Sequence, residues 1–220
     1  MKLDGSRLME TSIIGLGNIG SRLAKHLTDG EHSIIISERS LAKAEELAAK
    51  LGARARPMPI ADALRNAKVV VLAIHFQAIK EFMTEHREEL VGKIIVDPSN
   101  PIAPDGKGGF KKIIPADQSS GKIIAELAPH SAQVVKAFGT LSAESLGSAA
   151  HRSPEPAVLF YATDSPEAGK AVAKLITESG FTPISVGGID QAIRIEVGGD
   201  LHEFGKLGKV VSAKEAQALV

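Results

Sequence analysis

Cysteine is absent from this chain of 220 residues, and neither sign of charge is in excess. The absence of thiols excludes disulfides, thiolate nucleophiles, cysteine-ligated zinc and iron–sulfur clusters. Lysine plus arginine number 26, and aspartate plus glutamate also number 26. Because the charges balance, no overall field would draw the protein to nucleic acid or to an anionic membrane. An anion site would have to be local.

Long hydrophobic runs are missing as well. The longest uninterrupted apolar run, 69–74, is far shorter than the roughly 20 residues that a membrane helix needs, and it predicts a buried strand. Residues 1–9 include Lys2, Asp4 and Arg7 and lack the apolar segment of a secretory signal, so we expect a loose lead-in. We expect a cytoplasmic protein with no membrane or nucleic-acid partner and with a homodimer as the candidate assembly.

Short apolar runs alternate with stretches of helical pattern, which predicts a parallel sheet covered by helices. The predicted strands are 12–15, 33–37, 54–58, 69–74, 94–97 and 133–138, and helices should begin near Asn18, Leu41, Ile60, Ala78 and Gly121. The stretch 103–120 is rich in glycine, proline and lysine, so we expect a long polar loop that could cover the sheet edge.

A second break, 147–156, precedes one more strand–helix–strand unit. We expect strands 157–162 and 182–186, with a helix between them that opens at Ser165-Pro166 and closes at Gly180. The predicted fold is α/β, a Rossmann-type doubly wound parallel sheet with a small C-terminal α/β extension. The predicted division is a dinucleotide-binding domain, 9–153, and a small subdomain, 154–220, that completes an acceptor site.

A glycine motif directly follows the first predicted strand and runs into the first predicted helix. Gly15 permits a tight turn, Gly17 leaves room for a pyrophosphate, and Gly20 allows close packing of helix on strand. The intervening Asn18 and Ile19 begin the helix, whose N-terminus offers unpaired N–H donors to phosphates. This context predicts a dinucleotide site.

About 20 residues after these glycines, such a fold presents the group that binds the adenosine ribose. Two candidates compete here. Glu38 could accept a hydrogen bond from a ribose 2′-hydroxyl, as for NAD, whereas Arg39 with Ser37 or Ser40 could hold a 2′-phosphate, as for NADP. The alternative is that both charges are solvated. We expect NADP, with NAD as the alternative.

Several short motifs in order give the chain a family resemblance. They are the glycine loop, the 37–39 turn, the apolar run 69–74, the stretch 95–101, the stretch 134–138 and the segment 189–196. Together they resemble the F420-dependent NADP reductase family, which includes the cytoplasmic reductase domain of the STEAP metalloreductases. The chain departs from the family at Glu38, where serine is frequent, and at Gly139, where asparagine is frequent.

The resemblance implies a nicotinamide over the carboxyl ends of the strands, with a deazaflavin (F420) or a flavin such as FMN as second substrate under C-terminal segments. Ligands of open α/β sheets sit at that edge in any case. The residues expected to line it are Ala73, Ile74, His75, Asn100, Pro101, Ala137, Phe138 and Gly139.

His75 is the candidate catalytic residue, because it ends a predicted buried strand and would need a polar partner; a structural histidine is the alternative. We expect His130 and His151 to be loop residues, and Glu196 to act as a buried cap or ion-pair partner at least as readily as in chemistry. No HExxH or similar spacing predicts a metal.

These features favour an enzyme that passes hydride between a nicotinamide and F420 or a flavin, mainly by aligning two rings. The alternatives are a small-molecule NAD(P)-dependent dehydrogenase, whose relatives carry a larger helical C-terminal domain, and a non-enzymatic NAD(P)-binding redox sensor, which would need an effector module.

Overall fold

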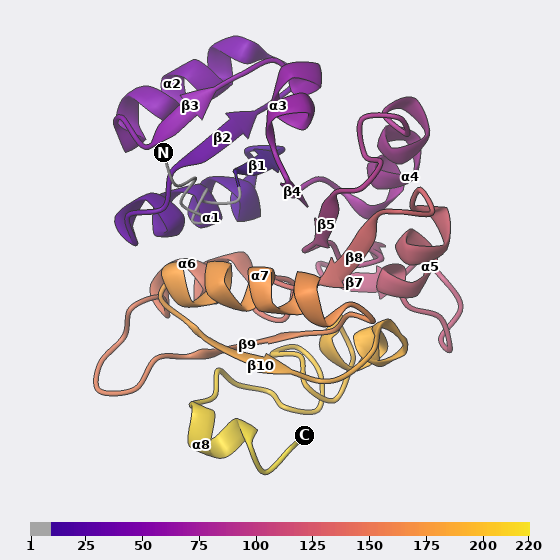
Figure 1. Ribbon diagram of the computed structural model, residues 1–220. Coiled ribbons are helices and arrows are strands. Elements are labelled where there is room, and N and C mark those ends of the chain that lie inside the picture. The colour runs from indigo at the N-terminus through magenta and orange to yellow at the C-terminus, as the bar shows by residue number, and fades with distance from the viewer. Residues whose placement is uncertain (1–9) are drawn as a thin grey trace.

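A computed structural model describes residues 10–220 (Figure 1). The predicted lead-in and the predicted domain start at residue 9 lie outside these residues. The main sheet is built from β1 (Thr11–Ile14), β2 (Ile34–Ser37), β3 (Ala55–Pro57), β4 (Val69–Leu72), β5 (Ile94–Asp97) and β8 (Gln133–Lys136). Its helices are α1 (Asn18–Asp29), α2 (Leu41–Leu51), α3 (Ile60–Asn66), α4 (Phe76–Glu85), α5 (Ser120–Leu127) and α6 (Ala143–Ser148).

The six strands lie in the order β3-β2-β1-β4-β5-β8, and every neighbouring pair is parallel. The order reverses beside β1, which gives the doubly wound topology that the sequence predicts. Alternate residues of the strands belong to two separate apolar clusters: Ile13 and Val71 lie in one, and Ile14 and Val70 lie in the other. Because both faces are covered, the strands are apolar throughout.

The C-terminal part forms the predicted strand–helix–strand unit. It consists of β9 (Val158–Tyr161), α7 (Pro166–Glu178) and β10 (Thr182–Ser185), with β9 and β10 parallel. Ser165 caps α7 with its hydroxyl, and Gly180 follows the helix at a φ of 85°, so the predicted start and stop signals are confirmed. Ala162 joins this unit to β8 through paired backbone hydrogen bonds with Lys136. The division at 153–154 stays a prediction.

Several boundaries differ from the expectation. β4 ends at Leu72 and β8 at Lys136, two residues earlier than predicted in each case, because the chain turns there into the loops of the sheet edge. The predicted polar loop contains a short antiparallel hairpin, β6 (Ile102–Pro104) and β7 (Phe110–Lys112). The last segment forms a 3₁₀ helix, η1 (Ile189–Ile195), and a short helix, α8 (Ala213–Ala216). Within residues 10–220, no helix has the length and apolar character to cross a bilayer.

Candidate functional site

Two of the motif glycines are required by close packing. Gly15 has a φ of 92°, and a Cβ atom there would lie 2.5 Å from Cγ2 of Ile74 and 2.6 Å from the carbonyl oxygen of Ala73. A Cβ atom on Gly20 would lie 1.9 Å from the carbonyl oxygen of Gly15. Both residues therefore hold the turn and α1 directly against the end of β4, and neither position has room for a side chain.

Gly17 differs from both. It precedes α1 with an ordinary φ of −72°, and a Cβ atom there would meet nothing within 4 Å. The space in front of the helix N-terminus is open, and Asn18 is exposed while Ile19 is partly buried. An open space at the N–H donors of a helix of 12 residues fits a pyrophosphate.

Glu38 turns toward the glycine loop. One oxygen of its carboxylate accepts from the N–H of Leu16 at 3.1 Å, and the other accepts from the N–H of Arg39 at 2.9 Å. Arg39 and Ser40 are exposed beside it. Because these backbone donors hold the carboxylate, the Arg39 guanidinium stays available on the surface for an anion.

Ser37 does not face this surface. Its hydroxyl is fully buried and donates to the carbonyl oxygen of Met58 at 2.8 Å, so we do not assign it to a 2′-phosphate. A pocket of about 260 Å³ lies between the glycine loop and α2. It is lined by Leu16, Gly17, Ser21, Glu38, Lys43, Glu46, Leu47 and Lys50.

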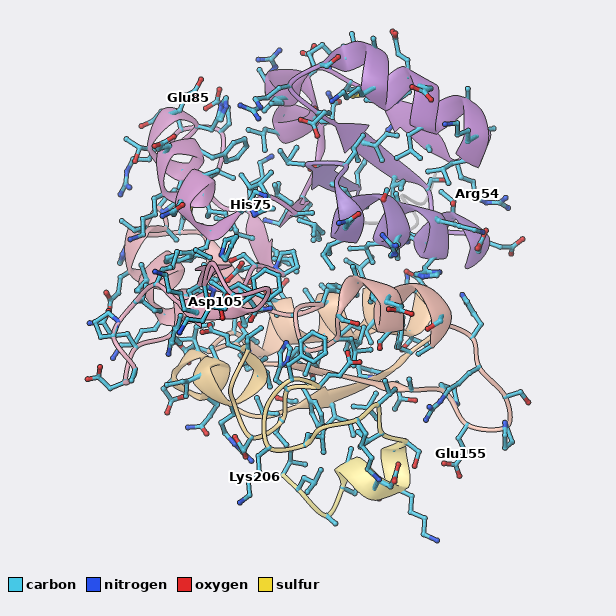
Figure 2. All side chains as sticks on the ribbon, turned by 180° about the vertical axis from the view of Figure 1, so that it is seen from behind. Arg54, His75, Glu85, Asp105, Glu155 and Lys206 are labelled. Carbon is cyan, nitrogen blue, oxygen red and sulfur yellow. The ribbon has the colours of Figure 1, made fainter. Side chains whose placement is uncertain are left out.

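His75 lies beyond the end of β4, at the start of α4, and its side chain is exposed (Figure 2). The expectation that it ends a buried strand is wrong, because β4 stops at Leu72 and the backbone then turns outward. Ala73 and Ile74 are partly buried in that turn. An exposed imidazole needs no partner within the protein, so it is open to a ligand at the strand edge.

Asn100 connects three loops at this edge. Its Nδ2 donates to the carbonyl oxygen of Gly139 at 2.9 Å, and its Oδ1 accepts from the N–H of Val197 at 2.7 Å. The loop after β5, the loop after β8 and the C-terminal segment are thereby joined. Pro101, which follows, is buried at the base of the hairpin and accepts from the N–H of Ile113.

Ala137, Phe138 and Gly139 form the turn after β8. Ala137 and Phe138 bury their side chains in the core, so only their backbone is left for a ligand. Phe138 has a φ of 63°, which is uncommon for a bulky residue and marks a tight reversal. A Cβ atom on Gly139 would lie 2.6 Å from the carbonyl oxygen of Pro98. The two loops touch here, so position 139 of this chain has no room for a side chain.

Three buried charges lie under these loops. Lys136 ends β8 and is 1% exposed; its Nζ lies 2.7 Å from Oδ2 of Asp97, at the end of β5, and 3.7 Å from Oε1 of Glu196. Nζ also donates to the hydroxyl of Ser120 at 2.7 Å and to the carbonyl oxygen of Ser99. We call Asp97, Lys136 and Glu196 the charged cluster.

Glu196 also caps α5. Its carboxylate accepts from the N–H groups of Ser120 and Gly121, at 3.1 and 3.0 Å, and from the Ser120 hydroxyl at 2.8 Å. The positive end of the helix dipole therefore adds to the lysine charge. The predicted capping and ion-pairing role of Glu196 is confirmed.

His202 is a second buried anchor of the C-terminal segment. Its Nδ1 accepts from the N–H of Phe204 at 2.8 Å, so the proton is on Nε2, which donates to the carbonyl oxygen of Gly139 at 3.0 Å. Burial lowers the pKa of His202 to about 4, against the raising effects of the Gly139 bond and of the Glu203 charge. The imidazole is neutral at pH 7.

Sequence reasoning missed Asp97, Lys136 and His202 as parts of this edge. Asp97 and Lys136 carried a signal, since Asp97 ends one predicted strand and Lys136 interrupts the apolar residues of another. His202 carried none, because its partner lies 63 residues away in the chain. His130 and His151 lie in exposed turns, as expected. Across residues 10–220, no group of three or more His, Asp or Glu could hold a metal ion.

Lys136→Met should destabilise the protein by about 3–5 kcal/mol, because it leaves two buried carboxylates without their cation. Lys25→Met removes an exposed pair with Asp29 and should change the free energy of unfolding by less than about 1 kcal/mol. Urea unfolding at pH 7 measures both. Equal changes in the free energy of unfolding for the two variants would show that the charged cluster contributes no more to stability than an exposed ion pair.

His202→Gln should reduce the loss of stability at low pH. The folded pKa lies below the unfolded value of about 6.5, so His202 favours the folded state fully above pH 6.5, and this contribution is lost as the pH falls toward 4. The slope is at most about 1.4 kcal/mol per pH unit. The variant should therefore lose up to about 3 kcal/mol less than wild type between pH 6.5 and 4. Exposed His75→Gln is the control, and parallel curves for all three proteins would contradict the assignment.

Comparison with known proteins finds relatives of this chain. A family model for NADP oxidoreductases, described as coenzyme F420-dependent, matches residues 10–101. The chain is 28% identical over 187 residues to the metalloreductase STEAP3 of Rattus norvegicus, a match that covers 85% of this chain and 36% of that protein. The chain thus spans about a third of that relative's length.

Two solved structures extend the comparison over nearly the whole chain. A hypothetical protein from Sinorhizobium meliloti is 31% identical with a TM-score of 0.82, covering 93% of this chain and 96% of that one. A proposed F420-dependent NADP reductase from Arthrobacter sp. FB24 shares the fold, with a TM-score of 0.71 at 23% identity over 83% of this chain and 86% of that one. The matched part of the chain, residues 10–101, is similar to the coenzyme F420-dependent NADP oxidoreductases.

Proposed function

We propose that this protein transfers hydride between the nicotinamide of NADP(H) and the planar ring of a deazaflavin (F420) or a flavin. The observation that carries the proposal is the state of the titratable groups at the strand edge. Asp97, Lys136, Glu196 and His202 are all buried and held in hydrogen bonds, and His75 alone is exposed there among the residues singled out. Transfer between two rings needs alignment and little acid–base help.

The residues present fit a dinucleotide. The open space at Gly17 and the N-terminus of α1 would receive the pyrophosphate, and the turn from Ala73 to His75 would face the nicotinamide together with Asn100 and the backbone of Gly139. When bound, NADPH supplies a hydride. The chain's own part is to hold this edge in place, since the Asn100 side chain joins the loop after β5 to the loop after β8 and to the C-terminal segment.

NADP is favoured over NAD by two features. The family is one of NADP oxidoreductases, and the Glu38 carboxylate is occupied by backbone donors, which reduces its repulsion of a 2′-phosphate. The exposed Arg39 and Ser40 are the groups that would hold that phosphate. Glu38 could instead accept a hydrogen bond from the ribose of NAD, so the choice between NADP and NAD can be tested.

The test is a matrix of purified protein with NADPH or NADH as donor and F420 or FMN as acceptor, followed by absorbance. The proposal expects turnover with NADPH and at least one of the two rings. Absence of turnover with both rings, together with reduction of a keto acid or an imine that collapses in His75→Ala, would make the protein a small-molecule dehydrogenase.

Gly17→Val should abolish NADPH binding while leaving a cooperative fold. The position has an ordinary backbone conformation and open space, so valine is tolerated by the protein, but its side chain would fill the space of the pyrophosphate. Calorimetric titration measures binding, and thermal unfolding checks the fold. Unchanged affinity for both NADPH and NADH would refute the assigned phosphate site.

Arg39→Ala should weaken NADPH binding by roughly tenfold or more, the loss of a charge-assisted hydrogen bond to phosphate, and leave NADH binding within about twofold. Arg54→Ala, at another exposed arginine, is the matched control. A wild-type preference for NADH that is indifferent to Arg39→Ala would show that Glu38 governs the choice.

A further inference from the structure

Phe204 is one of the few aromatic side chains that the fold leaves in solvent. The chain has seven phenylalanines, one tyrosine and no tryptophan. Five of the phenylalanines are buried, whereas Phe204 is 61% exposed and Phe110, in the hairpin, is 65% exposed. An exposed phenyl ring forgoes the free energy of burial. A phenyl ring on a fixed backbone beside the candidate site is therefore a candidate contact for a ligand.

The backbone on both sides of Phe204 is fixed. Its own N–H donates to the buried His202, and the N–H of Glu203 donates to the carbonyl oxygen of Thr140 at 3.1 Å. The Glu203 carboxylate accepts from the N–H of Ser142, the residue that caps α6. A Cβ atom on Gly205 would lie 1.8 Å from the carbonyl oxygen of Gly199, so the turn after the ring is tightly packed. The backbone that carries the exposed ring is therefore held in place.

These anchors place Phe204 at the carboxyl edge of the sheet. His202, whose ring centre lies 5.8 Å from that of Phe204, bonds the same Gly139 carbonyl oxygen as Asn100 does. The segment begins at Glu196, which the charged cluster ties to α5 and β8. In Figure 2, the C-terminal segment that carries Lys206 lies below the hairpin that carries Asp105, and His75 lies above that hairpin.

We propose that Phe204 is the platform on which the acceptor ring stacks, which makes it a binding residue for a planar flavin or deazaflavin. This inference rests on the proposed function. A flat conjugated ring is the ligand that a single exposed phenyl face recognises best. A partner protein fits less well, because the residues next to Phe204 in the chain are Glu203, Gly205 and Lys206, whereas the core of an interface is depleted of charged residues.

Direct binding of FMN and F420 tests the proposal without turnover, by anisotropy of their own fluorescence in the presence of saturating NADP⁺. Phe204→Ala and Phe204→Leu should each weaken the binding of whichever of FMN and F420 binds more tightly by about tenfold, which corresponds to about 1.4 kcal/mol. Phe204→Tyr, which keeps a flat ring, should stay within about twofold. NADPH affinity should be unchanged in all three.

A tryptophan at the same position gives a second measurement, since the chain has none. The Phe204→Trp variant should bind FMN or F420 and quench the fluorescence of that ligand by contact, whereas the Phe110→Trp variant should quench it much less. Equal ring affinity in wild type, Phe204→Ala and Phe204→Leu, with normal NADPH binding, would overturn the platform and leave the proposed function standing.

Two further outcomes also decide against the platform. If Phe204→Ala changes the sedimentation coefficient but not the affinity for FMN or F420, the Phe204 side chain serves an interface between copies of this chain. If wild type binds NADPH but neither FMN nor F420, the proposed function fails and the inference fails with it.

Discussion

The buried ammonium group of Lys136 is the constraint on which the edge of this protein depends. A lysine almost fully removed from water is tolerable only when its charge and its hydrogen bonds are matched, and here Asp97, Glu196 and Ser120 supply the match. The three partners come from β5, the C-terminal segment and α5. A single buried charge therefore fixes three separate parts of the chain relative to the end of β8.

That constraint determines what surrounds the candidate site. Glu196 starts the segment that runs past Val197 and His202. Val197 donates to Asn100 in the loop after β5, and His202 donates to Gly139 in the loop after β8. The loops in turn are so close that Gly139 cannot carry a side chain. Surroundings whose charged groups are already held in hydrogen bonds suit a reaction in which two flat rings must be aligned.

The sequence predicted the sheet and the packing of the glycine turn well because both follow from local rules. Alternation of apolar strands with helices, and glycines at fixed spacing, are determined by neighbours in the chain, and Gly15 and Gly20 are glycine for the packing reasons expected. The carboxyl edge was harder, since it is assembled from distant contacts such as His202 with Gly139. His75 was expected to end a buried strand but is exposed beyond β4, and Ser37 was expected, with Ser40 as the alternative, to help hold a 2′-phosphate although its hydroxyl bonds Met58 inside.

The central claim is that this edge brings two rings together so that hydride passes directly between them. The most direct measurement uses NADPH that carries deuterium at the transferred C4 position, with F420 as acceptor, and follows the label by mass spectrometry. The account predicts that the deuterium is recovered on the carbon of reduced F420, with none lost to water. Reduced F420 that carries only solvent hydrogen, or no reduction of F420 or FMN at all, would contradict it.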